Sequence, residues 1–238
     1  MSSVVQGVWR ASVPGSQPQP IVKPLYPDAG SGIVFNLGEE VLIGSKILPR
    51  GVIMLPVNKV TQFITLSPGS LIAGIRMHPA MGYAVFGRRY CEPTHIPRNE
   101  ACYRHLYKIF DALMQQANNS DHHVDTLIDW SRQHMDVSRL MPVSMQKILD
   151  GITHVEKLAG LDQYVGLSQR QVERLCNTWL GMTPKYFQRI LRVKEAILFL
   201  RKNNNNDLAN VAINFGFSDQ AHMTREFRHI ACTTPRAI

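Results

Sequence analysis

The sequence of 238 residues predicts an α+β protein with three regions. In residues 1–100, short apolar segments broken by proline and glycine predict a small β-sandwich or barrel. In residues 101–142, apolar residues at helical spacing predict a helical connector. Residues 143–238 hold two short turns, each with a glycine and a serine, on either side of one long helical stretch. This region is predicted to be an all-α domain with two helix-turn-helix motifs joined by a long helix.

The predicted strands are runs rich in valine, isoleucine, leucine and phenylalanine. They cover residues 4–10, 33–37, 52–55, 60–66 and 70–77. Residues 13–27 are rich in proline, which cannot donate to a strand ladder, so this segment is predicted to be an extended edge or a covering arm. Two interpretations are open for the large apolar residues of this region, either a ligand cavity or a core with no ligand. These residues are Phe35, Phe63, Ile75, Met77 and Phe86.

The connector is predicted to contain two helices, because two apolar stripes recur at helical spacing around a polar break at 118–121. The stripes are Leu106, Ile109, Phe110, Leu113 and Met114, and then Val124, Leu127, Ile128 and Trp130. Each stripe either packs on the β domain or pairs with a second copy of the chain. Pro142 then restarts the chain, and Ser144 is predicted to cap the next helix.

The two turns of the C-terminal region share a sequence pattern, in which a glycine is followed by a residue that can cap a helix. In the first, Gly166 can take the positive φ of a tight turn, and Ser168 with Gln171 three residues later makes a capping box. In the second, Gly216 is followed by two capping candidates, Ser218 and Asp219, so this turn is one residue longer.

The stretch between the turns predicts one long helix. Thr183 is a capping residue, Pro184 suits the first helical position, and residues 185–202 contain no further glycine or proline. The apolar residues at helical spacing are Phe187, Ile190, Leu191, Ile197 and Leu200. At 1.5 Å per residue, roughly 19 residues span about 28 Å. Two recognition helices on such a strut could enter successive major grooves, which are about 34 Å apart on one face of DNA.

This region resembles the DNA-binding domain of the AraC-type (AraC/XylS) bacterial transcription regulators. The features that carry the resemblance are Gly166-Leu167-Ser168, Arg174, residues 180–184, Arg192, Ala196, Leu200, Val211-Ala212, Phe215-Gly216-Phe217, residues 225–228 and Thr234-Pro235. The chain departs from the family's pattern at Cys176, Met223, Ala231-Cys232 and the terminal Ala237-Ile238. Residues 32–38 and 74–80 resemble a cupin-like sensor domain that is often found ahead of such DNA-binding domains.

The resemblance implies a regulator that binds double-stranded promoter DNA through recognition helices at about 168–180 and 219–230. Together with helix geometry it places base contacts on Arg170, Glu173, Arg174, Gln220, His222, Thr224 and Arg225. Arg174 and Arg225 are expected to make the strongest contacts to the DNA bases. The alternative for each arginine is a salt bridge to the supporting helix. Phosphate contacts are expected from Gln169, Thr183, Lys185 and Arg189, because the long helix begins near the DNA.

Composition is compatible with this interpretation. The net charge of +8 favours a polyanionic partner, and it divides into +3 before Pro142 and +5 from there on. The four cysteines show no CxxC pair, which fits free thiols in a reducing cytosol. The sequence shows neither a signal peptide nor an apolar run of 18 residues, so a cytoplasmic protein associated with the nucleoid, and not with a membrane, is expected.

The sequence does not indicate an enzyme, a metal or another cofactor. His122 and His123 are adjacent, so their side chains would point about 100° apart on a helix, and a solvated helix start is expected there. A DNA-repair alkyl transferase would need an activated cysteine motif, for which Cys91 is a poor substitute.

Two alternatives to a DNA-binding regulator remain open. One is a metal-dependent small-molecule enzyme of cupin type, although residues 1–100 hold only His78 and His95 and no His-x-His. The other is a regulator that acts through protein partners only. Further partners that the resemblance implies are a small-molecule effector in the N-terminal domain, a second copy of the chain and, for an activator, RNA polymerase.

Overall fold

The computed structural model of the chain describes residues 4–116, 122–135, 141–154, 158, 160–203 and 207–238. The chain divides into two compact units. The first comprises Met1–Leu25, Gly30–Val57 and Gln62–Leu140, and the second comprises Tyr26–Ala29, Asn58–Thr61 and Met141–Ile238. None of the described helices is both long and apolar enough to cross a membrane.

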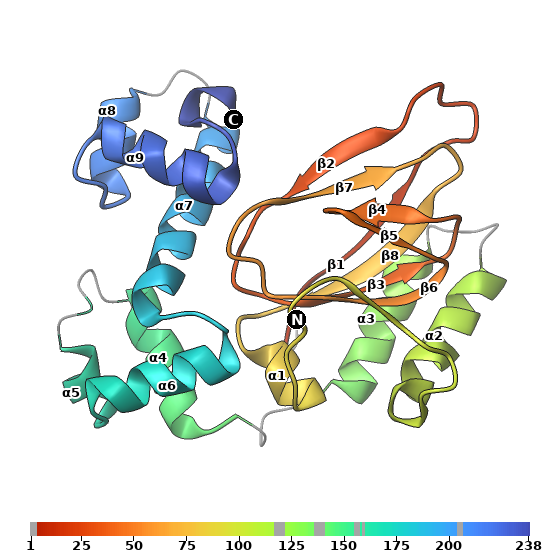
Figure 1. The fold of residues 1–238 in the computed structure, drawn as a ribbon, viewed down its shortest axis with the longest axis horizontal. Coiled ribbons are helices and arrows are strands. Elements are labelled where there is room, and N and C mark those ends of the chain that lie inside the picture. The colour runs from red at the N-terminus through yellow and green to blue at the C-terminus, as the bar shows by residue number, and fades with distance from the viewer. Residues whose placement is uncertain (1–3, 117–121, 136–140, 155–157, 159, 204–206) are drawn as a thin grey trace. The chain divides into compact units, whose positions relative to one another are not determined.

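The first unit is built on two antiparallel sheets (Figure 1). The five-stranded sheet has the order β1 (Val5–Ser12), β8 (Leu71–Met77), β3 (Gly32–Asn36), β6 (Gly51–Leu55) and β9 (Thr94–Ile96). The four-stranded sheet has the order β2 (Ile21–Leu25), β7 (Gln62–Leu66), β4 (Val41–Ile43) and β5 (Lys46–Leu48). The predicted proline-rich edge is confirmed, because β2 lies at the edge of its sheet and Pro24 pairs there with Phe63.

The two sheets face each other across an apolar core, which confirms the predicted sandwich. Alternate residues of each strand point inward, so Val34, Ile53 and Ile72 of one sheet pack with Ile43 and Ile64 of the other. The three-residue strands β4, β5 and β9, and the short helix α1 (Met81–Phe86), were not predicted. Each is too short to show a clear period in the sequence.

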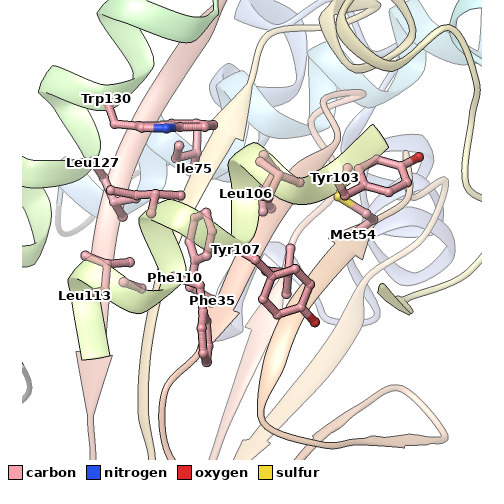
Figure 2. Packing of buried hydrophobic residues seen from close by; sticks show 14 of the residues in the cluster. Phe35, Met54, Ile75, Tyr103, Leu106, Tyr107, Phe110, Leu113, Leu127 and Trp130 are labelled. Atoms are coloured by element: carbon pink, nitrogen blue, oxygen red, sulfur yellow. The ribbon is translucent and has the colours of Figure 1, made fainter. Parts of the chain in front are cut away.

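The opposite face of the five-stranded sheet is covered by two helices, α2 (Arg104–Gln115) and α3 (His123–His134). Figure 2 shows side chains of α2 and α3, such as Phe110 and Trp130, packed with Phe35 and Ile75 of the sheet. A 3₁₀ turn, η1 (Ala101–Tyr103), leads into α2. The apolar stripes were predicted either to pack on the β domain or to pair with a second copy of the chain. The structure shows packing on the β domain.

The side chains that were considered as the lining of a ligand cavity do not all face a common space. Phe35, Ile75 and Met77 are buried under the helices, whereas Phe63 lies on the other sheet and is 44% exposed. The reason is strand parity, because neighbouring positions on a strand face opposite sides and β7 belongs to a different sheet. The core interpretation thus fits Phe35, Ile75 and Met77.

The second unit is helical. Its elements are α4 (Val143–His154), α5 (Leu161–Val165), α6 (Gln169–Trp179), α7 (Pro184–Lys202), α8 (Leu208–Asn214), α9 (Gln220–Glu226), a π-helical turn η3 (Phe227–Ala231) and a 3₁₀ turn η4 (Pro235–Ala237). The predicted cap at Ser144 is wrong, because α4 already begins at Val143 and Ser144 lies inside its first turn.

His123 differs from the expected solvated helix start, because it is fully buried at the beginning of α3. Its Nε2 lies 3.1 Å from the carbonyl oxygen of Leu113, while Nδ1 is buried without a hydrogen-bond partner among the described residues. Burial lowers the pKa of His123 below its ordinary value of 6.5. The imidazole is therefore neutral in the folded unit at neutral pH.

Replacing His123 with glutamine is expected to make the stability of the chain less sensitive to acid. Below about pH 6.5 the unfolded chain binds a proton that folded His123 binds less well, so stability is lost as the pH falls. A glutamine side chain would keep a donor for the Leu113 carbonyl without titrating. Calorimetric melting at about pH 7.5 and 5.5 should show a smaller drop in Tm for His123→Gln than for the wild type. The exposed neighbour provides the control, because His122→Gln should behave as the wild type. Equal drops in all three proteins would contradict the assignment.

Candidate nucleic-acid interface

The first helix-turn-helix is formed by α5 and α6. Gly166 closes α5 with φ 73°, and its amide donates to the carbonyl of Asp162 at 2.9 Å. Ser168 caps α6, because its Oγ accepts from the amide of Gln171 at 3.4 Å while the Ser168 amide donates to Oε1 of Gln171 at 2.9 Å. The predicted capping box is confirmed.

The second helix-turn-helix is formed by α8 and α9. Gly216 takes φ 71° after α8, and Asp219 caps α9 by accepting from the amide of His222 at 2.6 Å. This hydrogen bond lowers the pKa of Asp219. Of the two capping candidates the structure selects Asp219, so the predicted extra residue in this turn is confirmed. The Ser218 hydroxyl instead lies 3.1 Å from Nδ1 of His222.

The helix α7 joins the two motifs. Thr183 caps it by accepting from the amide of Tyr186 at 3.3 Å, and Pro184 occupies its first position, as predicted. It contacts α6 near its beginning and α9 and η3 further along (Figure 1). Its 19 residues correspond to about 28 Å of helix. The buried face of this strut consists of Pro184, Phe187, Ile190, Val193, Ala196, Ile197 and Leu200.

Most of the predicted DNA contacts have exposed side chains at the surface of this unit. Among them are Arg170 and Arg174 on α6, Gln220 and Arg225 on α9, and Lys185 in the first turn of α7. The opposite face of α6 is buried through Val172, Cys176 and Trp179. Burial raises the pKa of the Cys176 thiol to about 12, so this cysteine packs as an apolar group.

Several predicted contacts, among them Gln169, Glu173, His222 and Thr224, already hold hydrogen bonds within the unit. The side-chain amide of Gln169 donates to Oε1 of Glu173 at 3.2 Å, and the Thr224 hydroxyl donates to the carbonyl of Gln220 at 2.9 Å. His222 faces the turn, where its Nδ1 lies 3.2 Å from the amide of Ser218. Each of these groups would have to exchange or share a bond in order to meet DNA.

Arg189, a predicted phosphate contact, already forms an ion pair within the unit. Its Nε donates to Oε2 of Glu226 at 2.7 Å and its Nη2 donates to Oε1 at 2.9 Å. Burial alone would raise the pKa of Glu226, but the hydrogen bond and charge of Arg189 lower it below the ordinary value. The pair joins residues 37 positions apart, and the sequence pattern gave no sign of it.

The structure brings four predicted contacts together around one groove of about 590 Å³. Gln169 and Glu173 of α6 and Thr183 and Lys185 at the start of α7 line it, with Asp162 of α5. The exposed Lys185 is its only cationic lining residue among the described ones, beside two carboxylates. The groove therefore places the first turn of α7 and one side of α6 at a common surface.

The chain that follows α9 is irregular. After α9 the chain makes the π-helical turn η3, and Cys232 then takes φ 53°, a left-handed conformation that glycine adopts more readily. This is one of the positions at which the sequence departs from the pattern of the AraC-type domains that it resembles. Cys232 is exposed.

Within the described ranges, no group of three or more His, Cys, Asp or Glu side chains could hold a metal ion. The adjacent His122 and His123 diverge, with His122 exposed and His123 buried.

Comparisons with known proteins agree with this geometry. Residues 161–238, about a third of the chain, match a helix-turn-helix domain family. An apo variant of ToxT from Vibrio cholerae has a similar fold, with a TM-score of 0.51 and 7% identity over 100% of this chain and 97% of that one. A second crystal structure of ToxT from Vibrio cholerae gives a TM-score of 0.51 and 10% identity over 97% and 96% of the two chains. A comparison with curated proteins found no match. At these identities the likeness to ToxT shows the fold alone, and it confirms the predicted fold class.

Replacing Cys232 with glycine is expected to stabilise the second unit. A side chain in the left-handed region costs about 1 kcal/mol or more, and the greater flexibility of glycine in the unfolded chain offsets part of the gain. Urea unfolding should show an increase of roughly 0.5 to 1 kcal/mol in the free energy of unfolding for Cys232→Gly. Cys232→Ala keeps the β-carbon and serves as the control, with no comparable gain. A gain of the same size for both variants would mean that backbone conformation is not its source.

Proposed function

We propose that the chain is a DNA-binding transcription regulator of AraC type, in which α6 and α9 are recognition helices that enter successive major grooves of duplex DNA. The match of residues 161–238 to a helix-turn-helix domain family supports this proposal. In this proposal α7 sets their separation. One chain then carries two recognition helices that contact the same face of the promoter DNA.

The observation that carries the proposal is a shared pattern on the two helices. In α6, Val172 and Cys176 are buried and Arg174 between them is exposed. In the second helix, Met223 and Phe227 are buried and Arg225 between them is exposed. Each helix thus fixes one face in the core and directs one arginine to solvent at an equivalent position. Neither guanidinium is sealed inside the unit.

The contacts follow from this arrangement. Arg174 and Arg225 are proposed to bridge O6 and N7 of guanines, with Arg170 and Gln220 reading neighbouring bases. Glu173, His222 and Thr224 read bases only after exchanging their present hydrogen bonds. Lys185, Thr183 and Gln169 are proposed to hold phosphates where α7 begins, which positions the unit without selecting a sequence.

The N-terminal unit is proposed to regulate this binding. Its sandwich and the covering helices α2 and α3 form a compact body with its own core, as a sensor domain requires. A cupin-like origin, a small-molecule effector, a homodimer, contact with RNA polymerase and a cytoplasmic location remain predictions from the resemblance.

Substitution of the two exposed arginines is expected to change sequence preference. Duplexes selected by the wild type from random or genomic DNA would supply the site. Arg174→Ala and Arg225→Ala should each cost about 1 to 3 kcal/mol and relax preference at one base position, in different halves of the site. Binding measured against a panel of single-base variants of the site checks this.

Lys185→Ala is expected to behave differently from the arginine variants. It should weaken binding to all DNA sequences alike. Binding should release about one counterion fewer, so it should depend less steeply on salt concentration. Arg104→Ala, at an exposed arginine of α2, is the matched control and should leave both measurements unchanged. The contact assignment would be abandoned if Arg174→Ala and Arg225→Ala kept the wild-type base preferences. A wild-type chain that binds no duplex would instead favour a regulator that acts through protein partners.

A further inference from the structure

We infer that Arg189 and Glu226 are positioning residues that set how the second recognition helix presents Arg225, so that their ion pair determines sequence preference in one half of the DNA site without touching a base. This inference rests on the proposed function. It concerns the link between α7 and α9, which are parts of the same unit.

The Arg189–Glu226 pair is partly shielded from solvent. Its side chains are 28% and 13% exposed, and both Nε and Nη2 of the arginine engage the carboxylate. By contrast, the Arg132–Asp129 pair on α3 is 67% and 68% exposed. Exposed pairs contribute little to structure, whereas a shielded pair with two parallel hydrogen bonds holds a defined geometry.

Neighbouring aromatic contacts hold the arginine in place. Its guanidinium lies over the Tyr186 ring, 4.9 Å from the ring centroid. The Tyr186 hydroxyl in turn lies 3.4 Å from Nε2 of His229 in η3. Further along α7, Arg192 lies over the Phe217 ring of the second turn at 5.5 Å. The second motif is therefore attached to α7 by polar and cation–π contacts as well as by its core.

Helix geometry explains why this attachment controls Arg225. The helix α9 has only seven residues and leads directly into a π-helical turn, so its own backbone defines its orientation weakly. Glu226 is its last residue and follows Arg225. Adjacent residues on an α-helix point about 100° apart. Holding Glu226 against α7 thus fixes the direction in which Arg225 leaves the helix.

The first recognition helix lacks this device. When the two helices are aligned on their buried positions, Leu175 of α6 occupies the place of Glu226. Leu175 cannot form an ion pair, and α6 has 11 residues and a complete capping box. Loss of the Arg189–Glu226 pair should therefore affect one half-site only.

The test uses charge reversal in the full-length chain. Glu226→Arg and Arg189→Glu each place like charges together, and the double variant restores an opposite pair with the partners exchanged. Each single variant should lose roughly tenfold or more in affinity for the selected site, with the loss of base preference confined to the half read by Arg225. The double variant should recover most of that preference. Binding to single-base variants of the site and a hydroxyl-radical footprint measure the effect for each half-site.

Arg189→Lys provides a milder variant in case a reversal prevents folding. Lysine keeps the charge but cannot form the two parallel hydrogen bonds, so a smaller loss in the same half-site is expected. The Tm of every variant is measured in parallel. A merely structural role would lower Tm and weaken both half-sites together, and that outcome would overturn the inference.

Two further results would also overturn it. One is an unchanged preference in the second half-site for both single reversals, and the other is a double variant no better than either of them. If Arg174→Ala and Arg225→Ala change base preference as proposed while the reversals do not, only this inference fails. If the wild-type chain binds no DNA, the proposed function fails and the inference falls with it.

Discussion

The burial of one face of α7 is the constraint on which the C-terminal unit depends. Phe187, Ile190 and Val193 are each almost fully buried, and the same helix continues to Ala196 and Leu200. Because both motifs pack on this one rod, their separation is a property of a single capped helix and not of a flexible linker. The length of about 28 Å is close to one turn of DNA, as the proposed binding to successive major grooves requires.

The N-terminal unit depends on a similar constraint, in which the five-stranded sheet is covered on both faces. One face meets the four-stranded sheet and the other meets α2 and α3. This double coverage explains why β3 and β6 are buried at every position and do not alternate. It also accounts for the apolar stripes of the helices, which are used within the unit.

The two helix-turn-helix motifs share a plan but differ in the contacts that hold them. In the first, Ser168 and Gln171 cap α6 reciprocally, and Arg170 and Arg174 extend from the same helix. In the second, Asp219 caps a shorter helix, His222 bonds to its own turn, and Glu226 is tied to α7. Similar sequence patterns can thus present different sets of free polar groups, because each polar side chain takes the nearest partner that its fold supplies.

The sequence by itself determined the features that arise from contacts between near neighbours. Positive φ at Gly166 and Gly216, the capping box at Ser168 and the start of α7 at Thr183 all depend on residues within four positions of each other. Periodicity over a dozen residues likewise predicted α2, α3 and α7. For the same reason the exposure of Arg174 and Arg225 could be predicted from the pattern of buried positions around them.

Only the tertiary structure decided which faces pack together and which polar side chains have a partner within the fold. The ion pair of Arg189 could not be predicted from the sequence, because its partner Glu226 lies 37 positions away and on another helix. The burial of His123 and the pairing of the three-residue strands β4, β5 and β9 were hidden for a related reason. Such features leave almost no pattern in the local sequence. The contacts that stabilise them form between surfaces that become neighbours only when the chain has folded.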